Sequence, residues 1–135
     1  MKQLGGVHRI GAYVYLAAVL TQFFFAGLGL FGAASFAPHG ILGSLLVPYS
    51  LLLLLVAFAA RRAPGPTAVL FVFTLVQMML VWASDAAPVI SALHPVNALW
   101  LLFLGSAVAR GATLSTLVPG RDASGAEPAT APRVR

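Results

Sequence analysis

Long apolar segments separated by short polar ones dominate the first 110 positions of the chain. The first stretch runs from Ile10 to Ala60 without a single Lys, Arg, Asp or Glu. About 20 apolar residues cross the hydrocarbon core of a bilayer, so this stretch is long enough for two membrane-spanning helices. The small and helix-breaking residues at 32–38 indicate the turn between them. We therefore predict helices over about 10–31 and 39–60.

Two further apolar segments follow a short loop at 61–66 that is rich in arginine and proline. We predict helices over about 67–84 and 90–110, with a turn around Asp85 between them. Pro95 is compatible with the fourth helix because a proline in the first helical turn removes an N–H that has no partner there. Four spans with short connections predict an all-α fold, an integral membrane four-helix bundle with up-down-up-down topology.

The composition changes after the fourth predicted helix. Residues 111–135 are rich in Pro, Ala, Gly and Ser, and the apolar periodicity ends. Such a segment buries too little apolar surface to offset the entropy of ordering it. The sequence therefore predicts a transmembrane domain over 1–110 and a disordered cytoplasmic tail over 111–135.

The composition supports the lipid bilayer as the surroundings of the chain. Hydrophobic residues make up 60% and charged residues 8%, whereas soluble domains carry about 25% charged residues. The formal net charge of +5 is spread over the ends of the apolar segments and the tail, so no basic patch for nucleic acid is expected. The chain has no cysteine, which excludes disulfides and thiolate metal sites.

The positions of the basic residues predict the orientation of the bundle. Lys2 and Arg9 precede the first helix, the pair at 61–62 joins the second and third helices, and Arg110 ends the fourth. The two other turns contain no Lys or Arg. Because positive residues accumulate on the cytoplasmic side, we expect a multi-pass protein of the bacterial cytoplasmic (inner) membrane with both termini in the cytoplasm.

A polar motif occurs twice. Gln22 precedes His39 by 17 positions, and Gln77 precedes His94 by the same interval (39 − 22 and 94 − 77). The two copies are 55 residues apart (77 − 22), and each copy falls on one pair of predicted helices. This spacing predicts two helical hairpins related as parallel repeats. Both histidines would then lie at one depth, on the extracytoplasmic side, and face each other across a central cavity.

Two neutral imidazoles that face each other are suited to axial ligation of a b-type haem. A small residue follows each histidine after one helical turn, Gly43 and Ala98, and Gly27 lies on the first helix. Small side chains on one face would let a flat porphyrin approach the backbone. The metal ligands would be His39 and His94, and the predicted cofactor-binding set is Gln22, Gly27, His39, Gly43, Gln77, His94 and Ala98.

The same polar residues are compatible with several further roles. Gln22 and Gln77 could hydrogen-bond to each other or to backbone carbonyls, and His8 beside Arg9 is expected to anchor the helix at the membrane surface. With no catalytic motif in the sequence, the chain could be a non-enzymatic accessory subunit of a larger membrane complex. It could also bind a lipid or a quinone through the two glutamines. Copper binding through Met78 and Met79 is a minor alternative, because the histidines are expected at another depth.

Two resemblances support the leading hypothesis. The segments 22–31, 36–43 and 94–99 resemble those of an uncharacterised bacterial family of four-helix integral membrane proteins of unknown function. Each Gln-to-His hairpin is more distantly similar to the four-helix halves of haem A synthase, which implies haem ligation by His39 and His94. The acidic residue and the arginine near the histidine of that family are missing here, so synthesis of haem A is not expected. The first resemblance names no activity; the second, together with the two facing histidines, favours a small haem b-binding protein with an electron-transfer or redox accessory role.

Overall fold

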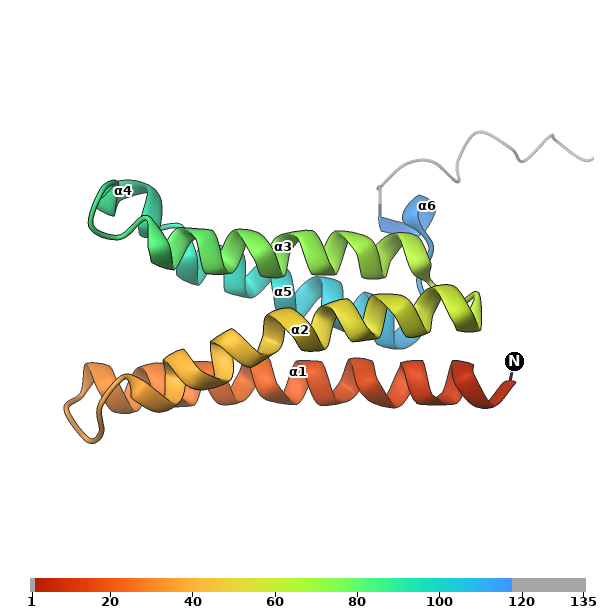
Figure 1. Cartoon of the computed structure of the whole chain (residues 1–135), viewed down its shortest axis with the longest axis horizontal. Coiled ribbons are helices and arrows are strands. Elements are labelled where there is room, and N and C mark those ends of the chain that lie inside the picture. The colour runs from red at the N-terminus through yellow and green to blue at the C-terminus, as the bar shows by residue number, and fades with distance from the viewer. Residues whose placement is uncertain (1, 118–135) are drawn as a thin grey trace, which may run out of the picture.

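The computed structural model describes residues 2–117, and within this range it is entirely helical. Four long segments run up and down beside one another (Figure 1). The helices are α1 (Lys2–Leu30), α2 (Ala37–Ala60), α3 (Pro64–Trp82), α4 (Pro88–Ser91), α5 (His94–Arg110) and α6 (Leu114–Leu117). The predicted all-α four-helix architecture is confirmed.

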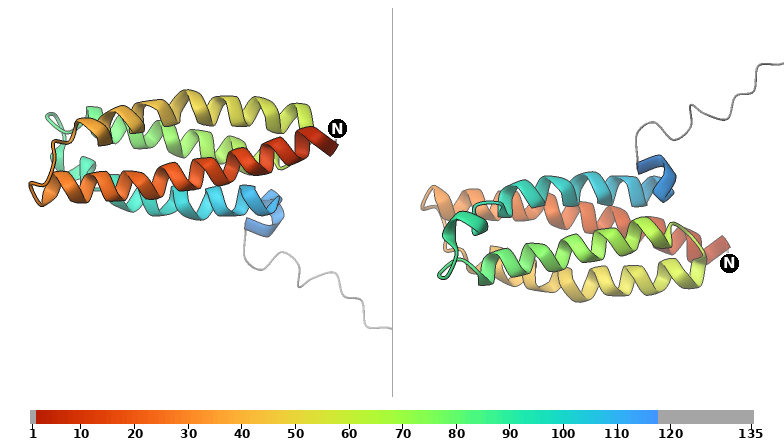
Figure 2. Two further views of the ribbon diagram at one scale, coloured as in Figure 1. Left: turned by 90° about the horizontal axis from the view of Figure 1, so that it is seen from below. Right: turned by 90° about the horizontal axis from the view of Figure 1, so that it is seen from above.

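Each long helix packs against two of the others. Helix α1 contacts α2 and α5, and α3 contacts the same two helices. Helices α2 and α5 therefore face each other diagonally across the bundle, as do α1 and α3 (Figure 2). The start of α1, the α2–α3 loop and α6 lie at one end, which we call the N-terminal end. The turn at 31–36 and helix α4 lie at the other, which we call the histidine end (Figure 1).

Four segments are long and apolar enough to cross a membrane: Gln3–Leu30, Ala37–Ala60, Pro64–Trp82 and Pro88–Arg110. Large apolar side chains cover the outside of the bundle, among them Leu20, Phe24 and Leu55, each about 60% exposed. A monomer in water rarely exposes contiguous apolar surface on this scale. The outer surface is therefore suited to lipid.

Most helix boundaries lie within three residues of those predicted, but two differ by more. Helix α1 begins at Lys2, eight residues earlier than position 10, because the polar residues at its start continue the helix beyond the apolar segment. The fourth segment is interrupted at 92–93, before Pro95. Proline has no N–H for a bond back to the preceding turn, so the chain begins a new helix at His94.

Part of the predicted tail is ordered against the bundle. Helix α5 ends at Gly111, whose left-handed φ of 79° favours glycine, and α6 follows at once. A Cβ built on Gly65 would lie 2.8 Å from a methyl carbon of Leu114, and Leu117 packs against the core. The described part of the segment predicted as a disordered tail thus includes the short helix α6. The remainder of that prediction, over 118–135, lies outside the described residues.

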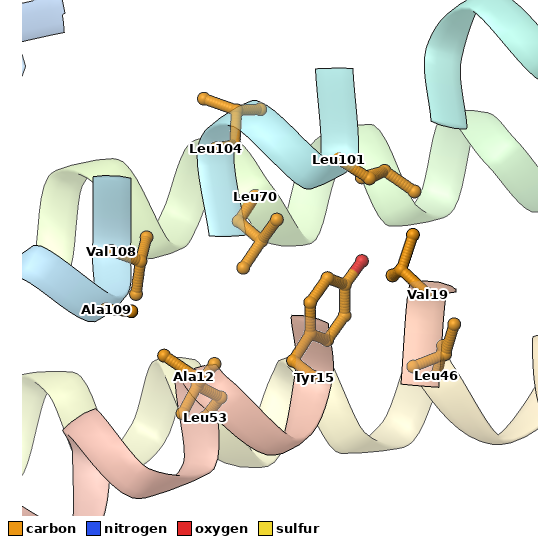
Figure 3. Packing of buried hydrophobic residues seen from close by; sticks show 10 residues of the cluster. All are labelled: Ala12, Tyr15, Val19, Leu46, Leu53, Leu70, Leu101, Leu104, Val108 and Ala109. Carbon is orange, nitrogen blue, oxygen red and sulfur yellow. The ribbon is translucent and has the colours of Figure 1, made fainter. Parts of the chain in front are cut away.

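The core follows a coiled-coil spacing. Along α1 the buried positions recur every three or four residues: His8, Ala12, Tyr15, Val19 and Gln22. Along α2 the same spacing recurs, at Leu46, Ser50, Leu53 and Ala57. This spacing keeps one stripe of each helix facing its neighbours and is typical of knobs-into-holes packing. Figure 3 shows the apolar part of this core, with the ring of Tyr15 extending from α1 toward Leu70 and Leu101.

Two side-chain hydrogen bonds cross the core from α1 to α3. His8 Nε2 lies 3.2 Å from Thr67 Oγ1, and the hydroxyl of Tyr15 lies 2.7 Å from Thr74 Oγ1. Each threonine donates its own hydroxyl to the carbonyl four residues earlier, so it accepts from the α1 side chain. His8 is fully buried between the helices. Its role as an anchor at the membrane surface stays a prediction.

We expect Tyr15→Phe to lower the free energy of unfolding of the bundle by about 0.5–1.5 kcal/mol, because the hydrogen bond to Thr74 is lost inside an apolar core. Thermal unfolding in detergent measures the change. Tyr13→Phe is the matched control, since Tyr13 lies on the same helix and is 55% exposed. Equal effects of the two substitutions would contradict a contribution from the Tyr15–Thr74 bond.

Candidate functional site

A cavity of about 280 Å³ lies between the four long helices at the histidine end. Its walls are mostly apolar, with six polar side chains: Gln22, His39, Ser44, Thr74, Gln77 and His94. Several lining residues, among them Phe23 and Trp82, are also exposed on the outside of the bundle, so the cavity opens to its surroundings. An apolar cavity with a few polar groups is the usual form of a small-molecule site.

The two repeated histidines meet in this cavity. The ring centroids of His39 and His94 are 6.0 Å apart, and the ring planes are inclined by 60°. His39 lies in the first turn of α2, and His94 is the first residue of α5. Because α2 and α5 are diagonal partners, the two rings face each other across the centre of the bundle.

A backbone carbonyl fixes the tautomer of His39. The Nδ1 atom of His39 lies 3.0 Å from the carbonyl oxygen of Gln22. A carbonyl oxygen only accepts, so Nδ1 carries the proton and Nε2 keeps a free lone pair. Histidines that ligate metals usually donate their other ring nitrogen in this way.

A side-chain network fixes the second histidine. Asn97 Nδ2 donates to the carbonyl oxygen of Phe73 (3.0 Å) and to Gln77 Oε1 (2.6 Å). Since Gln77 Oε1 accepts from Asn97, the donor that faces His94 is Gln77 Nε2. This atom lies 3.1 Å from His94 Nε2. His94 accepts this bond at Nε2 and carries its proton on Nδ1, which is buried without a partner among the described residues.

The amide of Gln22 differs from that of Gln77. Gln22 is 9% exposed, and its Oε1 has no partner among the described residues. Its Nε2 occupies the space beside Gly43, because a Cβ built on Gly43 would lie 2.9 Å from this atom. The sequence predicts that Gly43 gives a flat surface to a cofactor, whereas here the amide of Gln22 lies against it.

The structure brings six of the seven predicted cofactor-binding residues to the cavity. Gln22, His39, Gly43, Gln77, His94 and Ala98 all line it. Gly27 does not, and its neighbour Ala26 takes that place. Met78 also lines the cavity, but residues 2–117 contain no cluster of three or more His, Asp or Glu side chains suited to a metal ion.

The sequence interpretation leaves two polar connections unrecognised. Thr74 lines the cavity and accepts a hydrogen bond from Tyr15, which links the cavity to the core. Asn97 on α5 donates to the carbonyl of Phe73 and to Gln77 Oε1, both on α3, and so connects these two helices beside the cavity. One sequence signal identifies the first connection. Thr67 and Thr74 are seven residues apart, and so are their partners His8 and Tyr15.

Fold and site together define a small four-helix bundle, suited to a membrane, with a histidine-containing cavity at one end. A model of a family of unknown function (DUF6220) matches residues 22–85, a little under half of the chain. The matched range includes Gln22, His39 and Gln77 and ends before His94. The expected similarity to a family of unknown function is thus found, whereas the resemblance to haem A synthase stays a prediction. No curated protein and no solved structure matches the chain.

We expect the cavity to bind xenon, an apolar probe that enters apolar cavities in proteins. Gly43→Leu should remove most of this binding, because the new side chain enters the space beside Gln22. Xenon-induced changes in the amide NMR resonances of Gly40 and Ala98 measure it. Gly27→Leu is the matched control, since no atom lies within 4 Å of its added Cβ. Full xenon binding by Gly43→Leu would show that the cavity is elsewhere.

Proposed function

We propose that the chain is a small membrane protein that binds haem b through His39 and His94, with an electron-transfer or redox accessory role. The observation that carries this proposal is the 6.0 Å separation of the two ring centroids. A metal ion held between two imidazole nitrogens at about 2.0 Å each would place the ring centroids about 6 Å apart. Bound haem would supply a one-electron couple, which residues around the site would tune.

The described residues fit such a group in three further respects. His39 donates its Nδ1 proton to a backbone carbonyl and keeps Nε2 free for a metal. Ala26, Gly40 and Ala98 line the cavity with small side chains, and no atom lies within 4 Å of a Cβ built on Gly40. The mostly apolar walls would exclude water from a porphyrin.

Two features set conditions on binding. His94 Nε2 must leave the amide of Gln77 before it can ligate a metal. Among the described residues no lysine or arginine lines the cavity, so the carboxylates of a haem would lie toward the open histidine end. The N-termini of α2 and α5 are at that end, and a helix N-terminus favours negative charge.

We expect wild-type protein from haem-supplemented cells to show a Soret band and about one haem per chain. His39→Ala should lose the band, because it removes the ligand whose lone pair is free. The third histidine gives a matched control: His8→Gln, at the opposite end of the bundle, should keep the band at full intensity. Colourless wild-type protein that co-purifies with specific partners would instead favour an accessory subunit of a larger membrane complex.

A second candidate function, binding of a quinone or another polar lipid, is supported by a separate observation. Gln22 Oε1 and the Nδ1–H of His94, an acceptor and a donor on cavity-lining side chains, have no partner among the described residues. A buried polar group without a partner is costly, so a ligand would be stabilised if it accepts from His94 Nδ1, as a quinone carbonyl does, or donates to Gln22 Oε1, as the hydroxyl of the reduced quinone does. Mass spectrometry of material extracted from colourless protein would identify such a ligand, and Gln22→Leu should reduce its amount.

We also propose that the histidine end faces the outside of the bacterial cytoplasmic membrane. The basic residues of the described loops and helix ends lie at the N-terminal end, whereas the turns at the histidine end have none. Positive residues stay preferentially on the cytoplasmic side.

The absence of cysteine makes this orientation testable with single introduced thiols. In intact cells, a membrane-impermeant maleimide should label Ser84→Cys, which is exposed at the histidine end. Ser115→Cys, exposed on α6, should be labelled only after the membrane is permeabilised. The reverse pattern would place the site on the cytoplasmic side.

A further inference from the structure

The two halves of the site share the same Gln-to-His interval but differ in their hydrogen bonds. His39 is held by a backbone carbonyl and has a free Nε2, whereas His94 has its Nε2 engaged by Gln77. A metal would find the lone pair of His39 available, but it would compete with an amide for that of His94. The two histidines are therefore unequal as ligands.

The difference is traced to one residue. Asn97 donates to both Gln77 and the carbonyl of Phe73, and so fixes the amide of Gln77 toward His94. At the repeat offset of 55, the position equivalent to Asn97 in the first half is Leu42 (97 − 55). Leucine cannot donate, so Gln22 is not fixed in this way and its Oε1 has no partner among the described residues.

We propose that His39 is the permanent axial ligand and His94 an exchangeable one, so that the site binds a small neutral diatomic ligand, of the class of carbon monoxide, nitric oxide and dioxygen, in place of His94. This inference rests on the proposed haem function. The exchange would need no oxidant and no proton, because His94 Nε2 and the diatomic ligand are both neutral electron-pair donors and one would replace the other. The freed lone pair of His94 Nε2 would accept the N–H of Gln77.

Gln77 is thus a positioning residue that stabilises the open form. It does not touch the iron, and it acts by giving the released imidazole a partner inside the bundle. Without that partner, the released Nε2 would be a buried acceptor with no donor, which is costly. The pre-formed bonds to Asn97 hold the amide of Gln77 in place for this contact.

The test uses full-length haem-loaded protein, reduced with dithionite and titrated with carbon monoxide. We expect the wild type to show a shift of the Soret band with a measurable affinity. Gln77→Leu should weaken carbon monoxide binding by several-fold, up to about tenfold, because one hydrogen bond no longer favours the released His94. Gln3→Leu is the matched control, because Gln3 is an exposed glutamine at the N-terminal end of α1, and it should leave the affinity unchanged. Equal affinities in the wild type and Gln77→Leu would overturn the role of Gln77.

Two further measurements do not depend on the folding of a glutamine variant. The rate of carbon monoxide binding to the wild type should level off at high concentration, because His94 must leave first. His94→Ala should keep haem and bind carbon monoxide without this limit, whereas His39→Ala should lose haem. Wild-type protein with a Soret band that does not respond to carbon monoxide, or equal loss of haem in both variants, would overturn the inference while the haem function stands. Wild-type protein without the band would remove both.

Discussion

A polar side chain inside a bundle surrounded by lipid has to find its hydrogen-bond partner on another helix or on its own backbone. In this chain that constraint links α1 to α3, through Tyr15 with Thr74 and His8 with Thr67. Because α1 and α3 are diagonal partners, these bonds pass through the centre of the core. They fix the relative height and rotation of helices whose apolar contacts would tolerate sliding. Hydrogen bonds between membrane helices contribute roughly 0.6 kcal/mol each on average, so their effect is on register more than on total stability.

The same constraint explains where a ligand is needed. At the N-terminal end and in the middle of the core, the polar side chains that cross from α1 to α3 are paired with each other. At the histidine end, the helices enclose a cavity, and Gln22 Oε1 and His94 Nδ1 remain without partners among the described residues. Unsatisfied buried groups are uncommon in native proteins, and they concentrate where a ligand or water completes the site. His8 Nδ1 at the N-terminal end is also buried without a partner among the described residues, so what distinguishes the histidine end is that its two unpaired atoms belong to side chains that line a cavity.

The sequence predicts the architecture because composition and length determine it. Apolar segments of this length admit only a few arrangements, and short connections make consecutive helices neighbours. Helix ends are harder to predict, because the start of α1 at Lys2 depends on continuation of a helix through polar residues. The α6 helix escapes prediction for another reason. Leu114 lies in a segment of polar composition, and its position depends on contact with Gly65, which is distant in sequence.

The same distinction applies to the site. The 17-residue and 55-residue intervals predict that two histidines and two glutamines meet, because a repeat places equivalent residues at equivalent depth. The intervals do not predict which nitrogen of each ring is free. That depends on hydrogen bonds between helices, such as the bond from Asn97 on α5 to Gln77 on α3. The amide of Asn97 therefore decides which nitrogen of His94 is engaged by Gln77, and a search for motifs around the histidines would not detect this.

The contrast between Asn97 and Leu42 shows how a symmetric pair of hairpins acquires unequal roles. If the two halves were identical, both rings would be held in the same way, and a ligand between them would have no preferred side. Asn97 removes that equivalence, because its counterpart Leu42 cannot donate, although the two rings still meet with centroids 6.0 Å apart. The meeting of the two histidines therefore follows from the repeated spacing, and the chemical difference between them follows from a departure from the repeat.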